Sequence, residues 1–175
     1  MKRIYGLLGV ALLASTIAGG NTYAASKSSS DELKFNWEEA WENIENDPNY
    51  YPQTVDFVEE DTSDSSEMRT ASFSNYATGT TNLRFSNYYV YSKGVTNGQH
   101  LWTTTSAQTN LRNVDAGYIT IKGPRDTAVA FGDAVSEAKK KYIPLDGNFF
   151  TGMTLHTATM NGAIYEKATS DSDIF

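Results

Sequence analysis

Hydrophobic and polar positions change their spacing twice along the chain and so divide it into three parts. Residues 1–25 join a positively charged start to an apolar run over residues 7–18, which is too short to span a bilayer comfortably. Small residues then occupy the two positions that a signal peptidase reads. We therefore expect a signal peptide with cleavage near Ala24 or Ala25, and a secreted, extracellular mature protein.

The second part, residues 26–67, contains one helical pattern. Its apolar side chains recur at positions i, i+3, i+4 and i+7: Trp37, Ala40, Trp41 and Ile44. Asn36 is placed to cap the helix with Glu39 three residues on, and Asp47-Pro48 ends it. A helix of this length is unstable alone in water, so we expect Trp37, Trp41 and Ile44 to dock on the body or on a partner.

The third part, residues 68–175, has the composition of strands, and residues 59–67 have that of a flexible linker. Further extended segments are expected before the linker, with Val55 and Phe57 on one side, and in the body over residues 71–76, 117–122 and 127–131. The predicted fold is mainly β: a small antiparallel β-sandwich preceded by a short acidic amphipathic helix and a flexible linker.

Two Asn-Gly pairs predict hairpins, because both central residues of a type I′ turn need positive φ. One turn is expected at Asn97-Gly98 and the other at Asn161-Gly162. Residues 132–144 instead predict a helix that is capped by Asp133 and ended by Pro144.

A turn at Asn97-Gly98 would put four candidate ligand-binding residues on one face of its hairpin: Tyr89, Tyr91, Lys93 and Trp102. Two interpretations are open. The aromatic rings are buried or packed as cross-strand pairs, or Val90 and Leu101 face the core and these four side chains form an exposed strip. Aromatic faces in such a strip stack on sugar rings, and Lys93 would hold an anionic group.

Charge is distributed unevenly along the chain. Residues 31–67 hold thirteen acidic residues and one basic residue, whereas residues 68–175 hold eight acidic and ten basic ones. An acidic arm before a mildly basic body suits a leader that shields a binding surface, and equally a permanent helix packed on a sheet. The net charge of −7 makes nucleic acid an unsuitable partner.

The chain lacks the residues and motifs that most catalytic mechanisms need. The chain has no cysteine and two histidines, His100 and His156, without a metal-binding spacing, so we expect no metal site and no cofactor. No Gly-x-Ser-x-Gly motif, phosphate loop or dinucleotide fingerprint occurs. A glycosidase needs two carboxylates, and no pair stands out among the acids of the body. We expect no catalytic residues and no enzymatic activity.

One segment resembles a known family. The residues are Ser86, Asn87, Tyr88, Tyr89, Lys93, His100, Ala116 and Gly117, within "FSNYYVYSKGVTNGQHLWTTTSAQTN" and the following "NVDAGYITIKG". This pattern is similar to that of the lactococcin 972 family of secreted bacteriocins over about 40 residues, and the acidic arm has no counterpart in it. The resemblance implies a β-sandwich and interference with cell-wall synthesis at the septum through binding.

We therefore expect a secreted, non-enzymatic protein that binds a cell-envelope component, in the manner of an antibacterial effector. The expected partner is a cell-wall polymer, a lipid-linked precursor or an anionic envelope surface. One alternative is a structural protein of the cell surface that assembles as a homo-oligomer through sheet edges. A second is a small hydrolase of wall polysaccharide.

Overall fold

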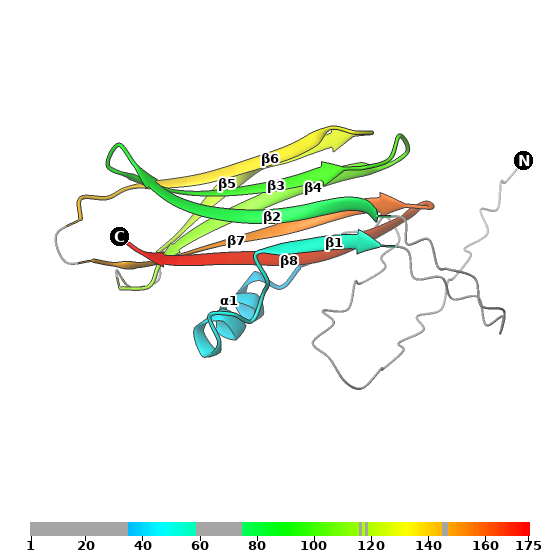
Figure 1. Ribbon diagram of the computed structural model, residues 1–175. Helices are drawn as coiled ribbons and strands as arrows, with labels where there is room; N and C mark the ends of the chain where they lie inside the picture. Colours follow the sequence, from blue (N-terminus) through cyan, green and yellow to red (C-terminus); the bar gives the residue numbers. More distant parts are fainter. Residues whose placement is uncertain (1–34, 59–74, 116, 118, 145–146) are drawn as a thin grey trace, which may run out of the picture.

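Two antiparallel sheets face each other and form a β-sandwich (Figure 1). The computed structural model describes residues 35–58, 75–115, 117, 119–144 and 147–175. One sheet has the strand order β1-β2-β3-β6 and the other β5-β4-β7-β8. The strands are β1 (Thr54–Val58), β2 (Asn75–Ser86), β3 (Tyr89–Gly98), β4 (Thr104–Asn113), β5 (Ile119–Val129), β6 (Asp133–Lys141), β7 (Phe149–Met160) and β8 (Ala163–Ile174). The predicted mainly β fold is confirmed, while the expected signal peptide and linker lie outside the described residues.

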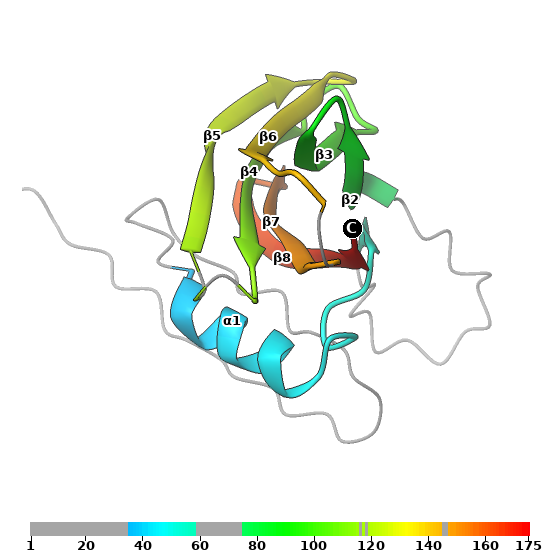
Figure 2. The ribbon, with the colours of Figure 1, turned by 90° about the vertical axis from the view of Figure 1, so that its left-hand side faces the viewer.

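The two sheets approach each other along both long sides, as the end-on view shows (Figure 2). On one side, the Val135 backbone N–H of β6 donates to Asp126 Oδ2 of β5 at 2.8 Å. On the other, Lys167 Nζ of β8 donates to the Asp56 backbone oxygen of β1 at 2.6 Å. These contacts partly cover the sheet edges through which the alternative of strand-by-strand assembly would operate.

Two hairpins have two-residue turns with left-handed backbone. Asn161 and Gly162 join β7 to β8 with φ values of 49° and 76°, so the predicted hairpin there is confirmed. Asn87 and Tyr88 join β2 to β3 with φ values of 50° and 63°. The turn at Asn87 and Tyr88 was not predictable from the sequence, because Tyr88, unlike glycine, does not favour positive φ.

The predicted hairpin at Asn97-Gly98 is wrong. Asn97 pairs with Thr78 of β2 and Asp133 of β6, so both residues belong to strand β3 itself. The chain then crosses to the other sheet through residues 99–103 before β4 begins. The Asn-Gly signal is local, whereas pairing with two flanking strands already satisfies the backbone of Asn97.

The helix predicted over residues 132–144 is also wrong, because most of this segment is strand β6. Ala134, Ser136 and Ala138 are buried at every second position, which is the period of a strand. The helical interpretation relied on Ala134, Ala138 and Tyr142, a spacing that an alternating pattern also contains. Likewise, the two strands expected over residues 117–122 and 127–131 form one continuous strand, β5.

The space between the sheets is unusually polar. His156 is fully buried and lies between Thr96 Oγ1, 2.8 Å from its Nδ1, and Thr169 Oγ1, 2.7 Å from its Nε2. Thr169 continues into a chain of buried hydroxyls through Thr81, Thr154 and Thr109, with oxygen separations of 2.5 to 2.8 Å. Mutual hydrogen bonding is what makes the burial of so many hydroxyl groups tolerable.

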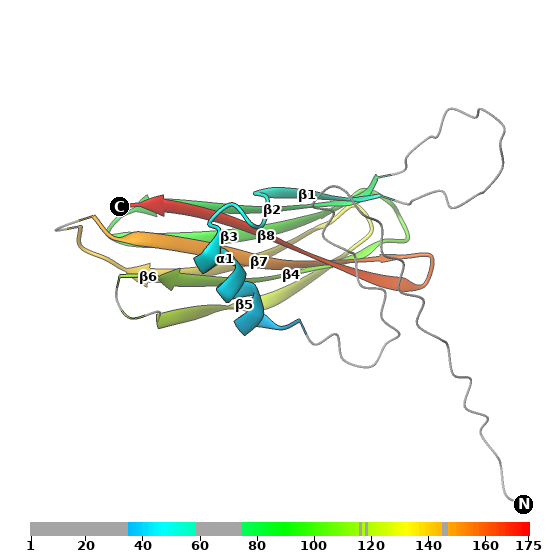
Figure 3. The ribbon, with the colours of Figure 1, turned by 90° about the horizontal axis from the view of Figure 1, so that it is seen from below.

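Helix α1 (Trp37–Asn46) lies across the outer surface of the sheet β5-β4-β7-β8 (Figure 3). Its predicted cap is confirmed: Asn36 Oδ1 accepts from the Glu39 backbone N–H at 3.3 Å, and Asn36 Nδ2 donates to Glu39 Oε2 at 3.1 Å. Strand β1 follows with Phe57 buried and Val55 packed beside it, as expected for this extended segment.

Candidate functional site

The outer surface of the sheet β1-β2-β3-β6 carries three of the four candidate ligand-binding residues. Val90, Ser92 and Thr96 of β3 are fully buried between the sheets. Because successive side chains of a strand point to opposite faces, the alternate residues Tyr89, Tyr91 and Lys93 point outward. The structure therefore agrees with the interpretation that Val90 faces the core while the tyrosines lie outside it.

Basic side chains of the neighbouring strands surround these tyrosines. Opposite Tyr91 lie Arg84 of β2 and Lys139 of β6, opposite Tyr89 lies Lys141, and opposite Lys93 lies Glu137. Residues directly opposite each other in an antiparallel pair share a face. We call this set the basic aromatic face, and its members are Arg84, Tyr89, Tyr91, Lys93, Lys139 and Lys141.

Ring and cation contacts hold the basic aromatic face together. The ring centroids of Tyr89 and Tyr91 are 6.0 Å apart. The Arg84 guanidinium lies 5.0 Å from the Tyr91 centroid, and Lys139 Nζ lies 5.9 Å from the Tyr89 centroid. Contacts of this kind at exposed sites contribute about 0.5–1 kcal/mol each, so they orient the side chains more than they stabilise the fold.

The electrostatic balance of this face favours an anion. It has four cationic side chains, against one nearby carboxylate on Glu137, which lies 3.8 Å from Arg84 in a partly exposed ion pair. An exposed pair of this geometry contributes between about 0 and 1 kcal/mol, so an anionic ligand can compete for the guanidinium. The arrangement therefore suits a ligand that offers negative groups together with a ring that can pack against the tyrosines.

Trp102 is not part of this face. It is 86% exposed and lies in the loop between β3 and β4. The neighbouring Leu101, which one of the two interpretations placed in the core, is 55% exposed. Tyr89 begins strand β3 and the loop follows its last residue, Gly98. At about 3.3 Å per residue, Trp102 is roughly 30 Å from Tyr89. The single strip of four residues followed from the incorrect turn at Asn97-Gly98.

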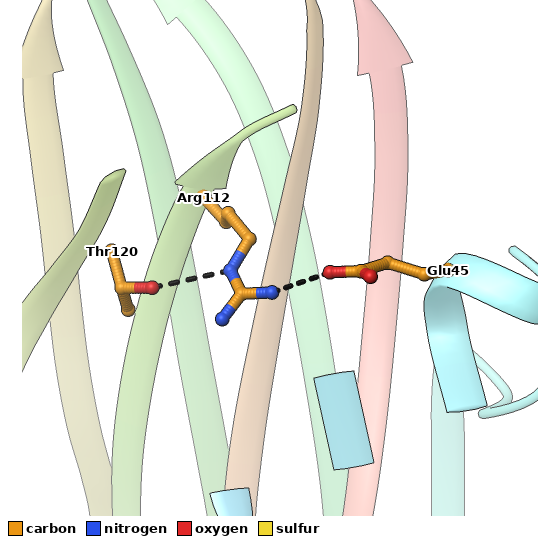
Figure 4. A network of polar contacts seen from close by, with 3 residues as sticks. All are labelled: Glu45, Arg112 and Thr120. Carbon is orange, nitrogen blue, oxygen red and sulfur yellow. Dashed lines mark hydrogen bonds and ion pairs between the residues drawn. The ribbon is translucent and has the colours of Figure 1, made fainter. Parts of the chain in front are cut away.

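The arm-docking residues meet the other sheet. Trp41 and Ile44 are buried against Met153 of β7, and Trp37 packs beside them partly buried. The Arg112 guanidinium of β4 lies 4.3 Å from the Trp41 ring centroid. Its Nη1 donates to Glu45 Oε1 at 2.6 Å and its Nε to Thr120 Oγ1 at 3.2 Å (Figure 4).

The position of the helix bears on which surface the acidic arm can cover. The helix is packed on the body, and it covers the sheet opposite to the basic aromatic face. It therefore does not shield that face. A pocket of about 110 Å³ remains beside the helix, and Trp41, Pro48, Arg112 and Phe149 are among its lining residues.

Two titratable side chains of the described residues have pKa values shifted by burial. Burial lowers the pKa of His156 to about 3, and its ring is enclosed between the sheets. Burial also raises the pKa of the Glu166 carboxyl, against the opposing effect of the Arg125 guanidinium. Within the described ranges, no three His, Asp or Glu side chains gather into a group that would hold a metal ion.

Arg84, Lys139 and Lys141 were not predicted as members of the site from the sequence. Lys139 and Lys141 were assigned to a helix, and Arg84 had no assigned partner strand. The alternation of small and large side chains along β6 was the signal available for the lysines. Arg84 comes to lie beside Tyr91 only through the pairing of β2 with β3, which no local pattern shows.

In the part of the chain that the structure describes, no helix has the length and apolarity needed to cross a membrane. Comparisons of the chain with models of protein families, with curated proteins and with solved structures found no match. The resemblance to the lactococcin 972 family therefore stays a prediction.

Proposed function

We propose that this chain is a secreted, non-enzymatic protein that binds an anionic polymer of the bacterial cell envelope through the basic aromatic face. The observation that carries the proposal is the contact of Arg84 with Tyr91 and of Lys139 with Tyr89, which places cations beside partly exposed tyrosine rings. Aromatic side chains with a polar tip are favoured at such partly wet contacts, and cations supply attraction to phosphate or carboxylate groups.

The acidic and basic parts of the chain fit this proposal. Lys93, Lys139 and Lys141 lie on the sheet opposite to helix α1, whose exposed residues include Glu38, Glu39 and Glu42. An anionic polymer on the basic aromatic face would thus be separated by the whole sandwich from the acidic helix. This separation reduces the repulsion between the polymer and the glutamates of the helix, because such repulsion falls off over about 8–10 Å at physiological salt.

The test is sedimentation of the full chain with purified bacterial cell walls, either intact or stripped of their anionic glycopolymers. The informative variant combines Arg84→Gln, Lys93→Gln and Lys139→Gln, all on the basic aromatic face. Its matched control is Lys122→Gln, an exposed lysine on β5 of the other sheet. We expect at least a tenfold loss of affinity for intact walls in the triple variant and none in the control.

Binding of the wild-type chain should also weaken as salt rises, because the attraction is between exposed charges. Equal binding of the triple variant and the wild-type chain would overturn the proposal. Release of soluble sugar fragments from the walls would instead favour the hydrolase alternative.

A further inference from the structure

A second surface lies at the end of the sandwich where β3 passes to β4 and β5 passes to β6 (Figure 1). The two loops lie side by side: the Ala130 backbone N–H donates to the Thr103 oxygen at 2.8 Å, and the Gly98 N–H donates to the Gly132 oxygen at 3.1 Å. Four large apolar side chains project from this end into solvent. They are Leu101, Trp102, Val129 and Phe131, with exposed fractions of 55%, 86%, 69% and 65%, and we call them the apolar tip.

The chemistry of the apolar tip is unusual for a water-exposed loop. Residues 94–111 and 127–132 contain no Asp, Glu, Lys or Arg. Several backbone N–H groups of the loops already donate within the tip, including those of Thr103, Ala130 and Gly132. A loop can enter an apolar medium without a large desolvation penalty when its backbone groups are hydrogen-bonded and its side chains are uncharged.

The position and residue types of the apolar tip favour a bilayer as its occupant. Leu101, Trp102 and Phe131 lie in two short loops and Val129 ends strand β5, and Trp102 is the most exposed of the four. Tryptophan is enriched at membrane–water interfaces, where its ring is buried and its N–H meets water or headgroups. The charged groups nearest to the tip have both signs. Asp126 accepts from Val135 N–H and Asp133 accepts from Asn97 Nδ2, while Arg125 Nη2 donates to Ser106 Oγ at 3.0 Å.

We propose that the apolar tip docks on a phospholipid bilayer by inserting Trp102 and Phe131 between headgroups. Because the tip segments themselves contain no Asp, Glu, Lys or Arg, this docking depends on apolar burial and not on anionic lipid. It is therefore distinct from the polymer binding proposed for the basic aromatic face, and the two respond differently to salt: polymer binding weakens as salt rises, whereas docking on uncharged headgroups does not.

The test is sedimentation of the mature chain, residues 26–175, with vesicles of phosphatidylcholine alone, at low and high salt. The apolar run of residues 7–18 is left out because it would bind vesicles by itself. The variant is Trp102→Ala with Phe131→Ala, and the control is Ile119→Ala with Ile143→Ala. The control residues are 53% and 58% exposed, outside the tip, so it removes two exposed apolar side chains at other positions. Unfolding temperatures of both variants should match the wild type, since all four side chains are largely exposed.

We expect the wild-type chain to bind these vesicles equally at both salt concentrations. The tip variant should bind at least tenfold more weakly and the control should be unchanged. Absence of binding by the wild type, or equal binding by the tip variant, would overturn the proposal. So would concentration-dependent dimers that form without vesicles and are lost in the tip variant, because a second copy would then cover the tip.

Discussion

The buried imidazole of His156 should make the unfolding free energy of this protein depend steeply on pH in a range where carboxylates stay largely ionised. The ring is fully buried and has threonine hydroxyls at both nitrogens, and its pKa is lowered from 6.5 to about 3. In the unfolded chain the pKa returns to about 6.5. Between these values the unfolded state binds one proton more, so stability rises with pH and falls on acidification.

The magnitude follows from proton linkage. A histidine that shifts from about 6.5 to about 3 on folding removes roughly 2 kcal/mol of stability between pH 7 and pH 5. That loss is a large part of the roughly 5–15 kcal/mol typical of small domains. The loss is complete only when the pH falls below the folded value, at about pH 3.

Urea unfolding at a series of pH values measures this effect. His156→Asn keeps a planar amide that can donate and accept but does not titrate, so it should be less stable at pH 7 and should lose about 2 kcal/mol less on going to pH 5. His100→Asn is the matched control, because His100 is exposed and stacks on Tyr76 at a ring separation of 5.0 Å. Parallel pH dependences for the wild-type and His156→Asn chains would refute the reasoning.

Three further predictions concern packing and burial. Gly94→Ala should lower the unfolding free energy by about 2 kcal/mol in urea titrations, since the added carbon would lie 2.3 Å from the side chains of Thr109 and Thr154. Trp41→Ala should either lower the unfolding free energy by about 3 kcal/mol or detach helix α1 from the sheet. Detachment would be seen as faster limited proteolysis after residue 35. Glu166→Gln should raise the unfolding temperature at pH 7 and lose this advantage in acid, because burial disfavours its carboxylate.

The sandwich and the amphipathic helix were predictable because their signals are periodic. Alternating β-branched and aromatic residues indicated strands, and the i, i+3, i+4, i+7 spacing of Trp37, Ala40, Trp41 and Ile44 indicated the helix. The cap at Asn36 was equally readable, since its partner Glu39 is local.

Strand order and the composition of the candidate site were less predictable, because they depend on long-range pairing. Asn97-Gly98 carries a strong turn signal, yet β2 and β6 pair with Asn97 from both sides and keep it extended. That change of register moves Trp102 from the side of Tyr91 to the end of the molecule. The polar core was equally hidden, because no local pattern shows that Thr81, Thr154 and Thr169 meet across the two sheets.

The basic aromatic face and the apolar tip imply a definite orientation at an envelope that contains both bilayer and polymer. Lys139 and Tyr89 lie at the opposite end of the sheet from the loops that carry Trp102 and Phe131. A chain docked by its tip would stand with its strands leading away from the bilayer. It would present the cations of the basic aromatic face at heights of roughly 15–30 Å above the bilayer, from Lys93 up to Lys141.

Sites so far apart and without shared partners should contribute independently to binding. On a surface that offers lipid and polymer together, simultaneous engagement raises the overall affinity above that of either site. A variant without the basic side chains should then keep a part of the binding that does not depend on salt. A variant without the apolar side chains of the tip should keep a part that weakens as salt rises. If a variant that lacks both sets of side chains still bound, a surface other than these two would hold the chain at the envelope.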